Sequence, residues 1–139
     1  MSIRIELSPF DIILKAFDKL YPDKDAIIVF SNGLYEDQGG YTYLSYPKED
    51  NEESLPPIIF IDCVVPLAVA ITMIEHQLAH VVLGQESADD TCTGTEDSHS
   101  EDFNEIFRNI RVECLRMMGE GMKNSKIFKP RNIDYSTMN

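Results

Sequence analysis

The feature that most constrains this chain is an apolar segment over residues 66–84 that a few polar side chains interrupt near its middle. Pro66 is suited to the first turn of a helix, and Gly84 is a natural helix stop. The segment is apolar on nearly all sides, which is typical of a helix packed between other elements. Because polar side chains break the run, it predicts a buried central helix and not a membrane span. These side chains are Glu75, His76, Gln77 and His80.

All three histidines of the chain lie in this segment or shortly after it. His76 and His80 are four residues apart, so on a helix they project about 40° apart from one face. His99 lies where the next helix is expected to begin. A catalytic zinc ion takes three protein ligands and leaves a fourth position for water. We therefore expect His76, His80 and His99 to bind Zn²⁺.

Two other residues are alternatives for the third ligand. Glu105, on the expected final helix, would complete the set of two histidines and one glutamate found in other zinc peptidases. Cys92 is a good zinc donor by its chemistry, but it lies in an acidic loop over residues 85–98. The simpler alternative is that His76 and His80 are core histidines without a metal. Buried histidines need hydrogen-bond partners, and this apolar helix provides few of them.

Length and composition limit the classes of protein to which the chain can belong. The 139 residues predict one domain, 1–139, with a core over about 8–118 and an irregular tail over 119–139. The net charge of −12 disfavours binding to nucleic acid. Three cysteines without a spacing motif, together with an N-terminus that lacks an apolar signal region, predict free thiols and a cytoplasmic protein.

Shorter patterns on either side of the central helix predict an α+β fold. Ser8 and Pro9 indicate the start of a helix that ends before Pro22, and three β-branched or aromatic runs predict strands over 26–30, 41–46 and 58–61. Strands that precede the long helices predict a small sheet packed against the histidine-bearing helix. The buried stripe of the first helix is expected to comprise Phe10, Ile13, Leu14, Phe17 and Leu20.

A last helix is expected after the acidic loop. Ser98 and Glu101 have the spacing of a capping box, which predicts a helix that begins at Ser98. Gly119 and Gly121 are expected to end it. Its predicted buried residues are Phe103, Phe107, Ile110, Cys114 and Leu115.

These residues carry a family resemblance. The segment from His76 to Gly84, followed by His99-Ser100-Glu101-Asp102-Phe103, resembles the His-Glu-x-x-His … His-Gly-x-x-Phe pattern of SprT-like zinc metallopeptidases. The order of elements also resembles the compact zincin core shared with ImmA/IrrE-like peptidases. The resemblance covers about residues 8–118, with its specific letters in 76–107. It implies a zincin-like fold, a Zn²⁺ cofactor and hydrolysis of peptide bonds.

The chain departs from the family pattern at Gln77 and Ser100, which stand where the family has glutamate and glycine. In the resembling enzymes the glutamate takes a proton from zinc-bound water, and a glutamine amide has no useful basicity. Loss of general acid–base catalysis costs about 10²–10⁴-fold in rate, so we expect a catalytically inactive form. Glu75 projects about 100° away from His76 and is expected to face solvent or to pair with a nearby base.

Three explanations of Gln77 remain open. It could be an engineered replacement of glutamate, or a natural feature of a pseudopeptidase that binds protein without cutting it. Alternatively, a carboxylate of the acidic loop could serve as the base; the candidates are Asp89, Asp90 and Asp97.

The expected partner is a protein or peptide. Zincins commonly hold a peptide as an added strand on a sheet edge, and residues 41–46 are the candidate edge. The acidic surface would suit a basic segment of such a partner. Tyr43 and Tyr135 are candidates to stabilise an oxyanion. The alternative function is a non-enzymatic binding or regulatory module.

Overall fold

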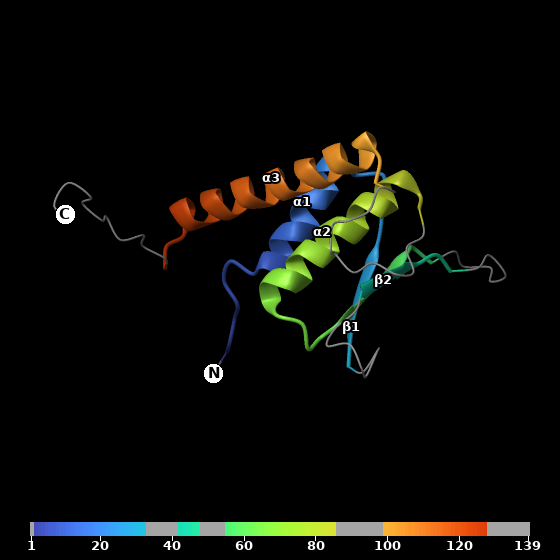
Figure 1. Cartoon of the computed structure of the whole chain (residues 1–139). Helices are drawn as coiled ribbons and strands as arrows, with labels where there is room; N and C mark the ends of the chain where they lie inside the picture. The colour runs from blue at the N-terminus through green and yellow to red at the C-terminus, as the bar shows by residue number, and fades with distance from the viewer. Residues whose placement is uncertain (1, 33–41, 48–54, 86–98, 128–139) are drawn as a thin grey trace, which may run out of the picture.

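A computed structural model describes residues 2–32, 42–47, 55–85 and 99–127 (Figure 1). Within these ranges the chain forms three helices and a three-stranded sheet, which confirms the predicted α+β class. The elements are α1 (Pro9–Leu20), β1 (Ile27–Ser31), β2 (Thr42–Ser45), β3 (Ile58–Asp62), α2 (Leu67–Leu83) and α3 (Glu101–Asn124). None of the helices in these ranges is long and apolar enough to cross a membrane.

The sheet has β3 at its centre and β1 and β2 at its two edges. β1 runs parallel to β3, with Ile28 opposite Ile59, whereas β2 runs antiparallel to it, with Leu44 also opposite Ile59. The predicted strand over 41–46 is therefore an edge strand, although it spans only residues 42–45 in the described part of the chain.

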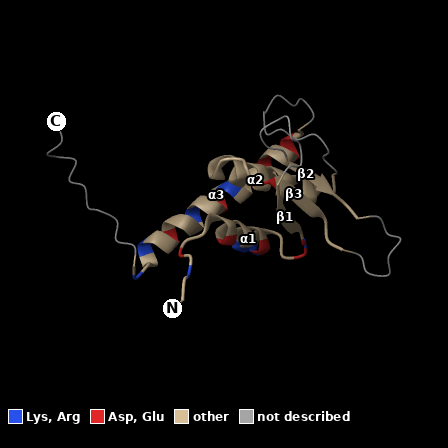
Figure 2. Cartoon of the chain, turned by 90° about the horizontal axis from the view of Figure 1, so that it is seen from below, with Lys and Arg blue, Asp and Glu red and all other residues tan. Residues whose placement is uncertain are grey.

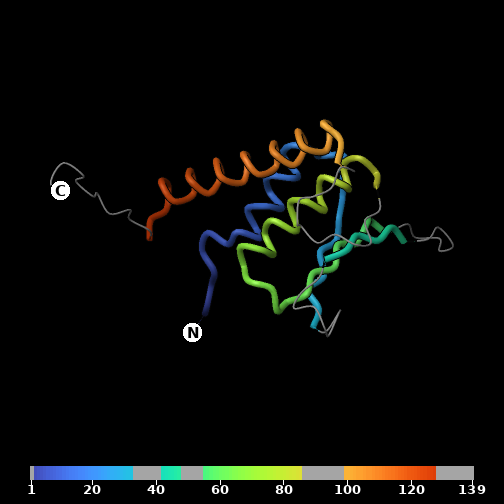
Figure 3. Tube along the Cα trace, viewed as in Figure 1, coloured from blue at the N-terminus to red at the C-terminus, as the bar shows by residue number. Residues whose placement is uncertain are grey.

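The helices cover one face of this sheet. Ile59 and Ile61 of β3 and Leu44 of β2 are buried and belong to the same hydrophobic core as α1, α2 and α3. Because side chains alternate along a strand, Tyr43 and Phe60 project from the opposite face, where their rings stack with centroids 4.6 Å apart. Figure 3 shows α2 lying between the sheet and the other helices.

The central helix α2 is buried on all sides from Met73 to Val81, as its composition predicts, while its first turn is exposed. Every residue in this range is buried, and the range spans more than two helical turns. α1 and α3 shield it from solvent and carry many of the charged residues (Figure 2). The functional side chains on α2 are consequently held in a packed environment and not on a free surface.

The structure corrects several details of α1 and α3. The N-cap of α3 is Ser100 and not Ser98: the Ser100 hydroxyl accepts a hydrogen bond from the Phe103 N–H at 3.1 Å. Ser8 is the N-cap of α1, but its side chain makes no capping hydrogen bond. Leu14 and Leu115, predicted to be buried, are 50% and 67% exposed, since each projects beside the apolar stripe of its helix.

α3 also continues through the glycines that were expected to end it. It includes Gly119 and Gly121 and ends at Asn124, so the expected irregular tail begins with helix. A Cβ at Gly121 would lie 2.8 Å from Cδ2 of Leu7, whereas one at Gly119 would meet nothing within 4 Å. The N-terminal segment therefore packs closely against α3 at Gly121, and a methyl group there would require the Leu7 side chain to move.

Candidate metal centre

His76 and His80 lie one turn apart on α2 and direct the same ring atom toward one point. Their Nε2 atoms are 3.2 Å apart, and both side chains are buried. The i, i+4 spacing places them on one helical face, as the sequence predicts. Two imidazoles that converge through Nε2 form the geometric core of the candidate centre.

His99 approaches this pair from the segment that precedes α3. Its ring centroid lies 4.7 Å from that of His76 and 5.2 Å from that of His80. The ligand atoms of the three histidines all lie within 4.8 Å of one another, close enough to hold a metal ion. The cap at Ser100 fixes the first turn of α3 and hence the position of the residue before it. The predicted trio of histidines is therefore brought together.

The ring of Phe103 packs against all three histidines. It stacks on His99 with centroids 4.0 Å apart and an interplanar angle of 11°, and it lies 5.0 Å from His76 and 4.6 Å from His80. His99 and Phe103 are four residues apart at the start of a helix, a spacing that lets side chains stack. Phe103 thus forms an apolar wall that limits the orientation of each imidazole.

A hydrogen bond at the other ring nitrogen of His80 prepares Nε2 for a metal. Nδ1 of His80 lies 3.1 Å from Oε1 of Gln85. A proton on Nδ1 would be donated to this amide oxygen and would leave a lone pair on Nε2. Gln85 is a neighbour of the candidate centre that the sequence did not predict, because it lies beyond the end of the helix.

The end of α2 explains how Gln85 reaches His80. Gly84 has a φ of +68°, and its N–H bonds to the carbonyl of Val81 at 3.1 Å, while the Gln85 N–H bonds to the carbonyl of His80 at 2.9 Å. This pair of hydrogen bonds is the Schellman pattern, which requires a left-handed residue and therefore favours glycine. The turn folds the chain back over its last helical turn.

The spacing of His76 and His80 is one at which two imidazoles can share a metal ion. Zinc lies about 2.0–2.1 Å from an imidazole nitrogen, so a tetrahedral ion keeps two such nitrogens about 3.3 Å apart. The observed separation of the His76 and His80 Nε2 atoms, 3.2 Å, is close to this value. The donor set of three imidazoles is also one that zinc commonly accepts in catalytic sites.

The environment of Gln77 also favours a polar group or ion beside the histidines. Its side chain is fully buried, and neither its amide nitrogen nor its amide oxygen has a hydrogen-bond partner among the described residues. Leaving both ends of a buried amide unpaired is costly, so a further polar group is expected beside it. On the helix, Gln77 projects about 60° from His80, on the flank of the histidine face.

The remaining candidates differ in where they lie. Glu105 is exposed on α3 and is not part of the cluster of ligand atoms. Tyr43 projects from the face of the sheet opposite α2, so it does not approach the histidines. The other candidates lie outside the described residues; they are Asp89, Asp90, Cys92, Asp97 and Tyr135.

Of the two environments expected for Glu75, solvent or a nearby base, the structure rules out solvent and places Arg111 nearby. Its side chain is buried on the side of α2 that meets α1 and α3, and only 3% of its surface is exposed. Burial raises the pKa of its carboxyl, and the positive charge of Arg111 partly opposes this shift. The expected nearby base is therefore present, although no hydrogen bond joins the two among the described residues.

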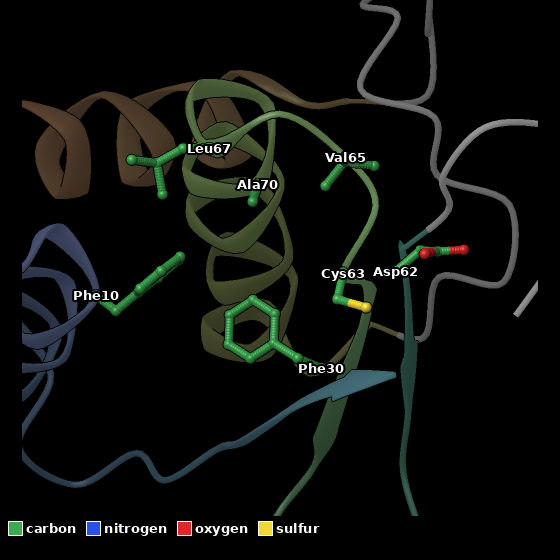
Figure 4. A pocket seen from close by; sticks show the side chains of 7 residues that line it. All are labelled: Phe10, Phe30, Asp62, Cys63, Val65, Leu67 and Ala70. Carbon is green, nitrogen blue, oxygen red and sulfur yellow. The ribbon is translucent and has the colours of Figure 1, made fainter. Parts of the chain in front are cut away.

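A separate cavity of about 280 Å³ lies at the N-terminal end of α2, away from the histidines (Figure 4). Phe10 and Phe30 form one side of it, and Leu67 and Ala70 of α2 form another. The carboxylate of Asp62 points away from this cavity (Figure 4), and its Oδ1 accepts a hydrogen bond from the Val64 N–H. The cavity is therefore mainly apolar.

The thiols within the described part of the chain, Cys63 and Cys114, are free. Burial, with contributions from Glu75 and Glu113, raises the pKa of Cys114 to about 12, so this thiol stays protonated at neutral pH.

Comparison with protein-family models, curated proteins and solved structures finds no match to this chain.

Proposed function

We propose that this protein is a zinc-binding protein of the metallopeptidase type, in which His76, His80 and His99 hold the ion. The observation that carries the proposal is the convergence of three imidazoles within 4.8 Å, with the Nε2 atoms of His76 and His80 at the separation that zinc requires. The sequence resemblance to SprT-like and ImmA/IrrE-like peptidases supports peptide-bond hydrolysis as the chemistry of this scaffold.

The chemistry depends on what the buried residues around the ion can do. A zinc ion with an open position polarises a carbonyl and lowers the pKa of a water molecule. Gln77 can orient a polar group by hydrogen bonds from its amide, but it cannot take up a proton at neutral pH. The described residues around the ion therefore include the ligands of a hydrolase but no general base at position 77, and we propose that the chain binds peptide without cutting it efficiently.

The metal site is tested first, by measuring zinc in the purified protein. We expect about one zinc ion per chain, with strong loss of affinity in each of His76→Ala, His80→Ala and His99→Ala. Glu105→Gln is the matched control, because the other interpretation of the third ligand requires this carboxylate. Zinc binding that survives all three histidine substitutions, or a protein that binds no added zinc, would contradict the proposal.

The catalytic part is tested by Gln77→Glu. Restoring a carboxylate at this position is expected to increase hydrolysis of an unstructured basic protein by about 10²–10⁴-fold over the parent chain. The double variant Gln77→Glu/His80→Ala is the control, since it has the base but lacks a ligand. If Gln77→Glu binds zinc normally and gains no activity, the peptidase part fails while the metal site stands.

The second candidate function is a non-enzymatic module that binds a protein segment. Two observations favour it: Gln77 is not a base, and β2 is an edge strand in the described sheet. The Tyr46 hydroxyl lies 3.5 Å from the carbonyl oxygen of His80, so the end of β2 lies next to the histidine helix. An extended peptide paired with β2 would therefore run past the centre.

Binding without cleavage is measured with a library of extended peptides of differing charge. This candidate predicts that basic peptides bind the parent chain and emerge intact. Equal binding of acidic and basic peptides would contradict the predicted charge preference.

A further inference from the structure

A cleft of about 290 Å³ opens where α1, α2 and α3 meet, on the side of α2 that does not carry the histidines. Its walls are mostly aliphatic, and each helix contributes to them. They include Ile12 and Ile13 of α1, Ile71 of α2, and Leu115 and Met118 of α3. A cavity of about 150 Å³ is large enough for benzene, so this cleft has room for an apolar group of that size together with a small polar head.

Glu75 places a carboxylate in this otherwise apolar cleft. Its side chain is 97% buried as judged by its 3% exposure, yet it makes no hydrogen bond and no salt bridge within the described ranges. Withdrawing a carboxylate from water carries a cost, and the charge of Arg111 offsets only part of it for Glu75. A ligand that brings a donor with positive charge would remove this cost.

Arg111 supplies the opposite charge on the same cleft. It is exposed on α3, it lines the cleft together with Glu75, and its charge acts on that carboxylate. The two groups do not form a salt bridge in the described structure. The cleft therefore has an acid and a base among its lining residues, together with an aliphatic wall.

We infer that this cleft binds a free apolar α-amino acid, with the ligand's ammonium on Glu75, its carboxylate on Arg111 and its side chain on the aliphatic walls. An α-amino acid carries both charges on one carbon, which matches an unjoined acid and base that line the same cleft. A simple amine would leave Arg111 without a partner and be repelled by it. A simple carboxylic acid would leave Glu75 buried and unpaired.

The proposed site is independent of the metal centre. Glu75 and His76 are neighbours in sequence but project about 100° apart on α2. The cleft also contains Cys114, whose protonated thiol adds a weakly polar, unreactive surface. Binding of an amino acid here is therefore expected to occur whether or not the protein contains zinc.

The test uses the whole chain and three matched probes: L-phenylalanine, phenethylamine, which lacks the carboxylate, and 3-phenylpropanoic acid, which lacks the amine. Titration calorimetry and methyl-detected NMR are the measurements. L-Phenylalanine is expected to bind saturably and to shift the methyl signals of Ile71, Leu115 and Met118. Each single-charge analogue is expected to bind at least about tenfold more weakly, since it leaves one charged group unpaired.

Variants separate the site from general effects on folding. Arg111→Gln changes an exposed side chain and is expected to reduce binding of L-phenylalanine at least about tenfold, whereas Arg108→Gln, an exposed arginine on the same helix, leaves it unchanged. Glu75→Gln is expected to abolish binding. Equal affinity for all three probes, unchanged affinity in Arg111→Gln, or no saturable binding of L-phenylalanine would overturn the inference.

Discussion

Gln85 lies directly beyond the end of α2 and bonds to Nδ1 of His80, on the side of the ring opposite the Nε2 atom that faces His76. With Nδ1 as the donor, this contact helps to orient the ring of a proposed zinc ligand and leaves a lone pair on its Nε2. The left-handed Gly84 makes this contact possible, because it turns the chain back toward His80. Metal-binding histidines commonly have such a partner on their second nitrogen, and it raises their basicity.

Removal of this partner is expected to weaken zinc binding. Gln85→Ala should lower zinc affinity by about tenfold, at the lower end of the usual ~10–100-fold effect, because Gln85 is exposed and water can replace it in part. Competition with a chromogenic chelator measures the change. Gln85→Glu retains an acceptor for the Nδ1 proton and should bind zinc at least as well as the parent. If both variants lose zinc affinity equally, the hydrogen bond to Nδ1 does not determine that affinity.

The main elements and the histidine trio could be predicted from the sequence because both depend on local spacing. The i, i+4 pair on an apolar helix fixes the relative direction of His76 and His80, whatever the rest of the fold. Ser100 and Gln85 could not be predicted in the same way. Ser98 and Ser100 both precede an acidic first turn, and only the hydrogen bond to the Phe103 N–H distinguishes the true cap.

The burial of individual side chains could not be predicted reliably from the sequence either. Glu75 is charged and was expected to face solvent or to pair with a nearby base. α1 and α3 cover its side of α2, so it is buried, and Arg111 is the nearby base. Leu14 and Leu115 show the reverse, since they are apolar and exposed. Helical periodicity predicts the buried face of a helix only to within about one residue. The packing of neighbouring helices determines which residues at the border of that face are buried.

Phe103 is expected to contribute to metal affinity through His99. Its ring stacks on His99 at 4.0 Å and supports the imidazole in its position before α3. Aromatic pairs of this kind contribute about 0.5–1.5 kcal/mol, so Phe103→Leu should weaken zinc binding by about 2–10-fold. Phe107→Leu is the matched control, since its ring lies 6.3 Å from that of His76. The two variants are compared by zinc titration, and equal effects would contradict a specific role for the stacked ring.

Glu113 is expected to make stability depend on pH in the acid range. It accepts hydrogen bonds from Arg116 on its own helix and from Lys19 of α1, and these bonds lower the pKa of its carboxyl to about 2. A carboxyl whose pKa is lower in the folded state stabilises the fold above its unfolded pKa, and this contribution is lost as pH falls through the folded pKa. The relevant window therefore runs from its ordinary value of 4.5 down to about 2.

The test compares Glu113→Gln with the parent by urea unfolding across this window. The variant should be less stable at pH 7, and the difference in free energy of unfolding should shrink to nothing toward pH 2. Lys15→Gln, which removes the pair of Lys15 with Asp11 within α1 alone, is the control for loss of a lysine contact. A difference between Glu113→Gln and parent that is constant with pH would contradict the assignment.

The two glycines of α3 are expected to respond differently to alanine. Alanine in the middle of a helix is favoured over glycine by about 0.5–1 kcal/mol. At Gly119 the added methyl group meets nothing, so Gly119→Ala should stabilise the protein by about that amount. At Gly121 it would lie 2.8 Å from Cδ2 of Leu7, and this side chain must move before any gain in helix propensity appears. Thermal unfolding should therefore rank Gly119→Ala above Gly121→Ala. The double variant Leu7→Ala/Gly121→Ala is compared with Leu7→Ala alone. It should recover the gain in stability from alanine, because the shortened side chain at position 7 removes the clash. If the gain is not recovered, Leu7 is not the cause of the difference.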